Sequence, residues 1–217
     1  QLDECGVCDG DNTSCNVPFA EDFEIELDED QLSSFMLPIT DQNGDPISLE
    51  IIFSPLFGNL TFDQTTFSFP YEDTEGNYLP DTEFSGLDEF SYYVVDNQGY
   101  ESEAATASIT VNFVDDSPKG TSIASEVNED EVLLVELVGS DIDTDDALLS
   151  FEIVQNPSHG TLSSVSRLTD QYYYTPSENY HGLDTLLYKV YDGNSYSQNT
   201  SVYISVLSVN DAPILTM

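Results

Sequence analysis

Apolar and polar residues alternate with a period of two along much of the chain. Residues 90–95 alternate Phe, Tyr and Val with Ser, Tyr and Val, and residues 109–112 read Ile-Thr-Val-Asn. Such alternation places one set of side chains in a core and the other towards water, as in a half-buried β-strand. Turn residues such as 43–46 (Asn-Gly-Asp-Pro) and 192–194 (Asp-Gly-Asn) separate the short runs, and no stretch shows sustained helical spacing. The pattern predicts an all-β chain built from sandwiches.

Comparison of the sequence with itself shows two copies of one unit. Residues 28–31 match 128–131, 37–41 match 137–141, 55–60 match 157–162, 84–90 match 180–186, 94–96 match 190–192, and 109–118 match 204–213. Six blocks in one order, about a domain apart, indicate a tandem repeat. We therefore expect a short segment at 1–16, one sandwich at 17–116 and a second at 117–217 that includes the start of the next linker. The first copy has extra residues near 72–82, which we interpret as a longer surface loop.

The charge of the chain restricts its partners. Forty-two Asp and Glu face three basic residues, which gives a formal net charge of −39. This surface repels nucleic acid and anionic membranes, both of which require cationic contacts, and it opposes its own compaction unless cations neutralise it. The aromatic content argues against disorder. Two interpretations remain open: a solvated acidic surface of the kind found in halophiles, or specific cation sites.

No catalytic constellation is evident. The two histidines, His159 and His181, occupy repeat positions filled by Phe57 and Ser85 in the first copy, and no nucleophile elbow, metalloprotease motif or phosphate loop occurs. There is no Trp to form a platform for a sugar. No apolar run approaches the roughly 20 residues of a membrane-spanning helix. We expect a non-enzymatic segment of a longer protein, without membrane insertion.

The motifs of each copy resemble the cadherin-like tandem repeats of large bacterial surface proteins. That pattern contains Ser-Asp-x-Asp, Pro-x-x-Gly-x-Leu, Tyr-x-Pro, an alternating strand that ends in Asp-Gly, and a closing Val-Asn-Asp-Ala-Pro. The second copy follows it, including 174–176 (Tyr-Thr-Pro) and Asp192-Gly193, whereas the first has Asn43, Asn97 and Phe69-Pro70 in place of family residues. The resemblance implies Greek-key, seven-stranded sandwiches in an extracellular protein, with calcium held between consecutive domains.

The same resemblance implies a set of calcium ligands. The middle junction would use Glu29, Asp88, Asp115 and Asp116 with Asp141, Asp143 and Asp192. The preceding junction would use Asp41, Asn43 and Asp96, and the following one would use Glu129, Asn210 and Asp211. Asp184 is a further candidate ligand. Calcium takes six to eight oxygen ligands, mostly carboxylates and carbonyls. Asp88 and Asp184 each follow Gly-Leu at the start of a strand, where a hydrogen-bonded turn explains them equally well.

The first residues form a separate motif. Residues 3–15 hold Cys5, Cys8 and Cys15, and they resemble one unit of the Asp/Cys-rich thrombospondin type 3 repeats. A Cys-x-x-Cys pair without a fourth ligand or a nearby His is a poor zinc site, so we expect disulfides in an extracellular setting. An odd number of cysteines leaves one thiol for another segment or another chain, and the pairing stays open.

We therefore expect an extracellular, calcium-binding structural or adhesion module, a rigid stalk or filament segment of a cell-surface protein. Its partners would be neighbouring repeats of the same or identical chains, or a cell-surface protein or glycan. A carbohydrate- or protein-binding module that uses the Tyr-rich loops 71–78 or 172–174 is one alternative, and a self-assembling filament subunit is another. A binding module would show an aromatic patch in one copy that the other lacks.

Overall fold

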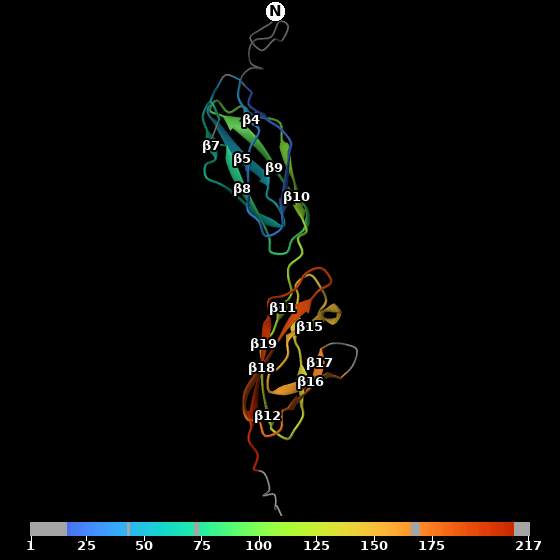
Figure 1. Cartoon of the computed structure of the whole chain (residues 1–217). Helices are drawn as coiled ribbons and strands as arrows, with labels where there is room; N and C mark the ends of the chain where they lie inside the picture. The colour runs from blue at the N-terminus through green and yellow to red at the C-terminus, as the bar shows by residue number, and fades with distance from the viewer. Residues whose placement is uncertain (1–16, 43, 72–73, 166–169, 211–217) are drawn as a thin grey trace, which may run out of the picture. The chain divides into compact units, whose positions relative to one another are not determined.

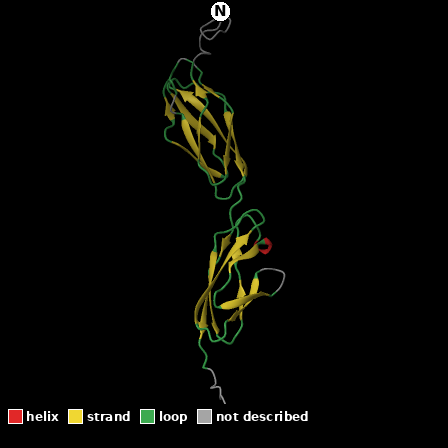
Figure 2. Cartoon of the chain, in the orientation of Figure 1, coloured by secondary structure: helices red, strands yellow, loops and turns green. Residues whose placement is uncertain are grey.

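The two copies fold as two compact units. A computed structural model describes residues 17–42, 44–71, 74–165 and 170–210, and it divides the chain into Gln1–Val114 and Asp115–Met217. Figures 1 and 2 show that nearly all of the regular structure is strand. Among the described residues the one helical element is a 3-10 turn, η2 (Asp146–Leu148). The prediction of an all-β chain with two tandem sandwiches is confirmed. The Asp/Cys-rich segment at 1–16 lies outside the described residues.

The first unit has two main sheets. One has the strand order β2-β10-β9-β5-β7 and the other the order β3-β8-β6, with a short β1-β4 pair beside them. β2 runs parallel to β10, whereas the other neighbouring strands are antiparallel. The strands are β1 (Phe19–Ala20), β2 (Phe23–Asp28), β3 (Ser33–Met36), β4 (Ile39–Thr40), β5 (Ile47–Phe53), β6 (Gly58–Phe62), β7 (Thr66–Phe67), β8 (Glu75–Pro80), β9 (Gly86–Asp96) and β10 (Ala105–Asn112).

The second unit repeats this plan, and its described residues include no counterpart of β7. Its sheets have the orders β12-β19-β18-β15 and β13-β17-β16, with a β11-β14 pair, and β12 is parallel to β19. The strands are β11 (Lys119–Gly120), β12 (Ile123–Asn128), β13 (Leu133–Glu136), β14 (Gly139–Ser140), β15 (Ser150–Gln155), β16 (Gly160–Ser164), β17 (Gln171–Pro176), β18 (Gly182–Tyr191) and β19 (Thr200–Leu207).

Each core is built from the inward positions of the long strand that follows the Gly-x-Asp motif. In β9 the side chains of Phe90, Tyr92 and Val94 are fully buried, and β18 buries Tyr188 and Val190 in the same way. Each large side chain of this kind contributes about 1.5–3 kcal/mol when it leaves water. The structure therefore has the predicted alternation of inward and outward side chains. The buried side chains fix β9 and β18, and with them the positions of the strand ends.

A buried tyrosine links the two sheets in each unit. The Tyr78 hydroxyl of β8 donates to Asp88 Oδ2 at 2.8 Å, and the Tyr174 hydroxyl of β17 donates to Asp184 Oδ2 at 2.9 Å. The tyrosine ring lies so close to the glycine of the Pro-x-x-Gly-x-Leu motif that a Cβ atom on Gly160 would fall 2.3 Å from a Tyr174 ring carbon. That motif therefore requires glycine because it makes room for the tyrosine ring.

The structure corrects two sequence interpretations of the first copy. Residues 72–82 are not simply a longer loop, because most of them form the internal strand β8 (Glu75–Pro80). The counterpart of Tyr174-Thr175-Pro176 is consequently Tyr78-Leu79-Pro80, and not Phe69-Pro70. The extra residues of the first copy instead lie before β8, where they include β7 and the Phe69-Pro70 turn.

We predict that Gly160→Ala destabilises the second unit by about 1–3 kcal/mol, because the added methyl group collides with the Tyr174 ring and with the Thr175 carbonyl oxygen. Urea unfolding measures the change. Thr161→Ala, at an exposed neighbouring position of β16, is the control and should cost less than about 0.5 kcal/mol. Equal stability of the two variants would contradict this reason for the glycine.

Candidate metal sites at the ends of the sandwiches

An acidic loop lies at one end of the second unit, between β14 and β15. Asp141 Oδ1 accepts hydrogen bonds from the backbone N–H groups of Asp143 at 3.0 Å and Thr144 at 2.7 Å. The other carboxylate oxygen, Asp141 Oδ2, is buried and has no hydrogen-bond partner among the described residues. A buried acceptor without a donor costs roughly 1–3 kcal/mol, and more when it is charged. The loop therefore fixes Asp141 with one oxygen satisfied and the other available to a cation.

Further carboxylates from the same unit join this loop. The Asp116 N–H donates to Asp143 Oδ2 at 2.7 Å, and the Asn194 side-chain amide donates to Asp115 Oδ2 at 2.6 Å. Asp192 lies in the same Asp-Gly-Asn turn as Asn194. Hydrogen bonds thus join the segments that carry five predicted ligands of the second unit, which are Asp115, Asp116, Asp141, Asp143 and Asp192. Sequence reasoning missed Asn194, although its place after Asp192-Gly193 in a turn was a usable signal.

The Asp192 carboxylate is held by hydrogen bonds from its own turn. Burial alone would raise its pKa, but the N–H groups of Asn194 and Ser195 and the Ser195 hydroxyl outweigh this effect, so that the pKa lies below its ordinary value. The carboxylate is therefore ionised at neutral pH. A ligand for a hard cation needs this charge state.

The corresponding end of the first unit has the same chemistry. Asp41 and Asp96 are only 5% and 6% exposed. Asp96 Oδ1 accepts from the N–H groups of Gln98 and Tyr100, each at 2.8 Å, while the buried Asp96 Oδ2 has no hydrogen-bond partner among the described residues. Asp45, which sequence reasoning did not select, donates its N–H to Asp41 Oδ1 at 3.3 Å. Asn43 lies outside the described residues.

Two buried glutamates hold the chain where each unit ends. Glu29 Oε1 accepts from the Val114 N–H, and Glu129 Oε1 accepts from the Val209 N–H, both at 2.6 Å. The glutamates are 4% and 8% exposed. Each therefore ties the last residues of its unit to the turn after the second strand of that unit. Asn210 follows Val209, and Asp211 lies outside the described residues.

Asp88 and Asp184 are saturated with hydrogen bonds. Asp88 accepts from the N–H groups of Leu56, Phe57 and Glu89 and from the Tyr78 hydroxyl. Asp184 has the same four kinds of donor in the second unit. A carboxylate offers about four lone-pair positions, and here all of them are used. This geometry favours the hydrogen-bonded turn over the ligand role for both residues.

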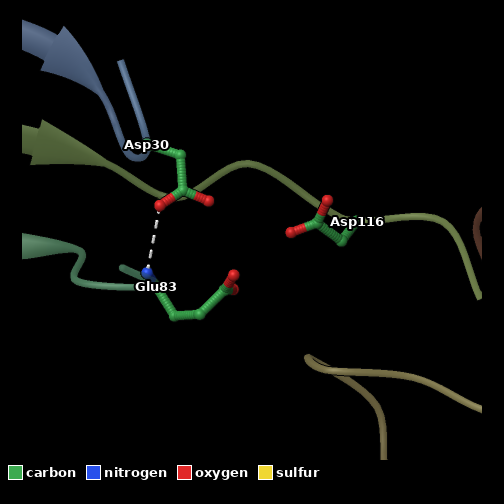
Figure 3. Close-up of side chains that lie close together, drawn as sticks. All are labelled: Asp30, Glu83 and Asp116. Carbon is green, nitrogen blue, oxygen red and sulfur yellow. Dashed lines mark hydrogen bonds between the residues drawn. The ribbon is translucent and has the colours of Figure 1, made fainter. Parts of the chain in front are cut away.

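A second pair of acids in the first unit was not selected from the sequence. Asp30 and Glu83 have carboxylate oxygens within 4.8 Å of one another, and the Glu83 N–H donates to Asp30 Oδ1 at 3.3 Å. Figure 3 shows this hydrogen bond. Both residues have left-handed backbone conformations, with φ values of 57° and 61°. The Asp116 drawn with them belongs to the second unit.

The Tyr-rich segments serve mostly as structure. Tyr78 and Tyr174 are fully buried, and burial together with the hydrogen bond to the partner aspartate raises the pKa of each phenol. The Tyr71 hydroxyl donates to the Asp45 carbonyl oxygen. Of the three tyrosines at 172–174, Tyr173 alone is largely exposed. The segments 71–78 and 172–174 thus present few tyrosine faces to a ligand.

Each of these two ends carries aspartates whose carboxylates are oriented by backbone N–H groups. Among the described residues, Lys189 Nζ of β18 lies 3.3 Å from Glu152 Oε2. Oxygen-only donor sets suit hard divalent cations. The unpartnered Asp96 and Asp141 oxygens show that the residues present fit such an ion. Within the described part of the chain no helix has the length and apolar character needed to cross a bilayer.

Comparison with protein families gives a match to both units. The family described as "Bacterial Ig domain" matches residues 16–113 and 115–205. No curated protein matches the chain.

Comparison with solved structures returns cadherin domains and other multidomain proteins. The human protocadherin-24 EC1-2 structure has a TM-score of 0.52 at 14% identity, with 89% of this chain and 100% of that chain covered. The human mucin-like protocadherin EC1-2 structure gives a TM-score of 0.45 at 16% identity, covering 89% and 100%. An endo-fucoidan hydrolase of glycoside hydrolase family 107 gives a TM-score of 0.39 at 14% identity. The match covers 93% of this chain and 30% of the hydrolase chain. At 14% identity, the likeness to the protocadherin-24 structure shows the fold alone.

We predict that Asp184→Asn destabilises the second unit by about 1–3 kcal/mol. The new side-chain NH2 group faces N–H or O–H donors whose hydrogen bonds the carboxylate accepted, so these donors lose their acceptor. The loss should be the same with and without calcium. Thermal unfolding in calcium and in chelator measures it, with the exposed Glu178→Gln as control. A variant that keeps its stability in chelator and loses a calcium effect would instead assign Asp184 to a metal site.

Proposed function

The chain belongs to the bacterial Ig domain family, and we propose that it is a non-enzymatic, extracellular structural or adhesion segment whose acidic sandwich ends bind calcium. The ions would stiffen the connection between neighbouring repeats of this chain, or of identical chains. The cadherin-like fold and the tandem arrangement support this proposal. The calcium and the mechanical role are our inference.

One observation carries the calcium proposal. Asp96, at a strand end of the first unit, and Asp141, in a loop of the second, lie at matched ends of the two sandwiches. In each, one carboxylate oxygen accepts hydrogen bonds from backbone N–H groups, and the other is buried without a donor among the described residues. A merely solvated acidic surface would direct both oxygens to water. A directed, desolvated oxygen among further carboxylates is the arrangement that a cation stabilises.

The donor set favours calcium over softer metals. The described residues supply carboxylate and amide oxygens at these ends, and the histidines are not among them. Calcium accepts six to eight such oxygens in flexible geometry, and extracellular modules bind it with dissociation constants of about 10⁻⁴–10⁻³ M. At millimolar extracellular calcium such sites are largely occupied.

The proposed mechanism relies on the continuity of the chain. Glu29 holds the Val114 N–H, and the next two residues are Asp115 and Asp116. These two acids contact Asn194 and Asp143 within the second unit. Ions bound to the Asp115–Asp116 segment would neutralise mutually repelling carboxylates and order the connection, whereas without ions the same charges would separate.

We predict that calcium raises the free energy of unfolding of the second unit by about 2.7 kcal/mol at a free concentration roughly 100 times Kd. Asp141→Asn should abolish most of this gain while keeping an oxygen for the Asp143 and Thr144 N–H groups. In chelator the variant should be as stable as the parent or more stable, because it removes an unpartnered buried charge. Thermal and urea unfolding, with and without calcium, measure both effects.

The matched control for this experiment is Asp145→Asn in the same loop. Asp145 is exposed and its Oδ1 accepts from the Ala147 N–H, which an asparagine oxygen can also do. It should therefore retain the calcium gain. The proposal fails if calcium leaves the parent unchanged, which would favour the solvated-surface interpretation, or if Asp145→Asn and Asp141→Asn behave alike.

Tyr71 offers a spectroscopic reporter at the other unit. Burial, and then the charges of Asp41 and Asp45, raise the pKa of Tyr71 to about 12. The neutral phenol is thus favoured in the folded state, and its contribution to stability is lost as the pH rises from about 10 to about 12. Calcium bound at Asp41 and Asp45 would cancel part of the repulsion and lower this pKa.

We therefore predict a calcium-dependent shift to lower pH in tyrosinate absorbance at 295 nm that is present in the parent and missing from Tyr71→Phe. The shift should also vanish in Asp96→Asn, which keeps an oxygen for the Gln98 and Tyr100 N–H groups. An identical titration with and without calcium would show that no ion binds near Tyr71.

A further inference from the structure

The first unit has an exposed apolar groove beside β5. Phe53, Leu56, Phe57 and Leu87 line a hollow of about 480 Å³, with Glu89 at its edge. Leu56 and Leu87 are 82% and 76% exposed. This volume falls within the range of small binding sites, roughly 300–1,000 Å³. We call these five residues the apolar groove.

The second unit shows that the fold does not need this apolar surface. The residues that match Phe53, Leu56 and Phe57 are the polar Gln155, Ser158 and His159. The turn is nevertheless the same, because Ser158 and His159 donate their N–H groups to Asp184 as Leu56 and Phe57 donate to Asp88. Exposed apolar residues that an equivalent sandwich lacks therefore have a reason other than folding.

The ring contact beneath the groove is common to both units. Phe57 stacks on Phe84 with centroids 4.5 Å apart, and His159 stacks on Tyr180 with centroids 4.1 Å apart. The stack fixes the turn in both cases. What differs is the side chains of the turn, which are the exposed Leu56 and Phe57 in the first unit and Ser158 and His159 in the second.

The groove continues along an incompletely paired strand. β7 pairs with β5 only at Ile47 and Ser48. In the described part of the chain, residues Glu50–Phe53 of β5 therefore have no neighbouring strand on the side away from β9. Ile51, Ile52 and Phe53 are all exposed apolar residues there. An extended segment lying along β5 could therefore place apolar side chains against this strip and into the groove.

The surrounding charge indicates what kind of segment fits. The three basic residues of the chain, Lys119, Arg167 and Lys189, all belong to the second unit. There Lys189 pairs with Glu152, whereas the matching pair in the first unit is Tyr93 and Glu50. Glu89 likewise replaces Thr185 at the edge of the groove. The acids near the groove thus have no Lys or Arg within their own unit. Electrostatic complementarity therefore favours a partner that supplies a positively charged side chain.

We propose that the apolar groove binds an extended segment of another protein that carries apolar side chains next to Lys or Arg. A second copy of this chain is a poor occupant, because two chains of formal charge −39 repel one another. An anionic membrane is repelled for the same reason. The proposal does not depend on calcium binding, and it concerns a different surface of the first unit.

The test uses the full chain in saturating calcium and the synthetic peptide Lys-Leu-Lys-Phe-Lys-Leu, with Glu-Leu-Glu-Phe-Glu-Leu and Lys-Ser-Lys-Ser-Lys-Ser as matched probes. Amide chemical shifts measured by NMR should change for the basic apolar peptide at residues 50–57 and 86–89, and not at the matching residues 152–159 and 182–185. Neither control peptide should produce these changes. Binding should weaken as salt is added.

The decisive variant converts the groove to the residues of the second unit, Leu56→Ser with Phe57→His. Since His159 and Ser158 occupy the same turn, this variant should fold, and an unchanged thermal unfolding curve checks that it does. Affinity for the basic apolar peptide should fall on the order of tenfold or more, as expected for loss of central apolar anchors. Unchanged affinity, equal binding of the acidic peptide, or a parent dimer that the variant abolishes would each overturn the proposal.

Discussion

A carboxylate oxygen that leaves water must meet either a hydrogen-bond donor or a cation, and this requirement organises both ends of each sandwich. Asp88 and Asp184 meet it entirely with protein donors, three N–H groups and one tyrosine hydroxyl each. Asp96 and Asp141 meet it only in part, since one oxygen of each is buried without a donor. The same residue type therefore serves as an internal tie at one position and as a candidate ligand at another.

This distinction gives meaning to a net charge of −39. Most of the described acids are exposed and can be solvated at little cost, as they would be in any acidic protein. In the calcium proposal, the acids that matter are those that backbone N–H groups orient at the ends of the units, because orientation and partial burial would turn mutual repulsion into affinity for a cation. Family membership and fold fit this account, but the oriented oxygens are the physical basis for it.

Much of the architecture could be predicted from the period of two and from the internal repeat. The alternation at residues 90–95 identified the core strand β9, and the repeated Gly-x-Asp blocks identified the starts of β9 and β18. The loop predicted for 72–82 was wrong because β8 has few apolar residues and its Tyr78-Leu79-Pro80 is separated from the neighbouring motifs by inserted residues. Pairing with β3 and β6 makes it a strand, and such long-range pairing leaves little trace in local sequence.

The candidate sites were predictable by residue type but not by hydrogen bonding. The sequence left a hydrogen-bonded turn and a ligand role equally open for Asp88, and the donors at 2.8–3.0 Å around its carboxylate favour the turn. Asp45 and Asn194 were missed because their roles arise from contacts to Asp41 and Asp115. The apolar groove could not be predicted, because Leu56 and Leu87 have the residue type of a core and only the structure shows that they are exposed.

The most direct measurement of the central claim is a crystal structure grown in calcium, with anomalous diffraction used to locate the metal. The account predicts peaks bonded to Asp96 Oδ2 and Asp141 Oδ2 at about 2.3–2.6 Å, each with further oxygens completing six to eight ligands. Well-ordered density in which both oxygens contact only water or protein donors would contradict it.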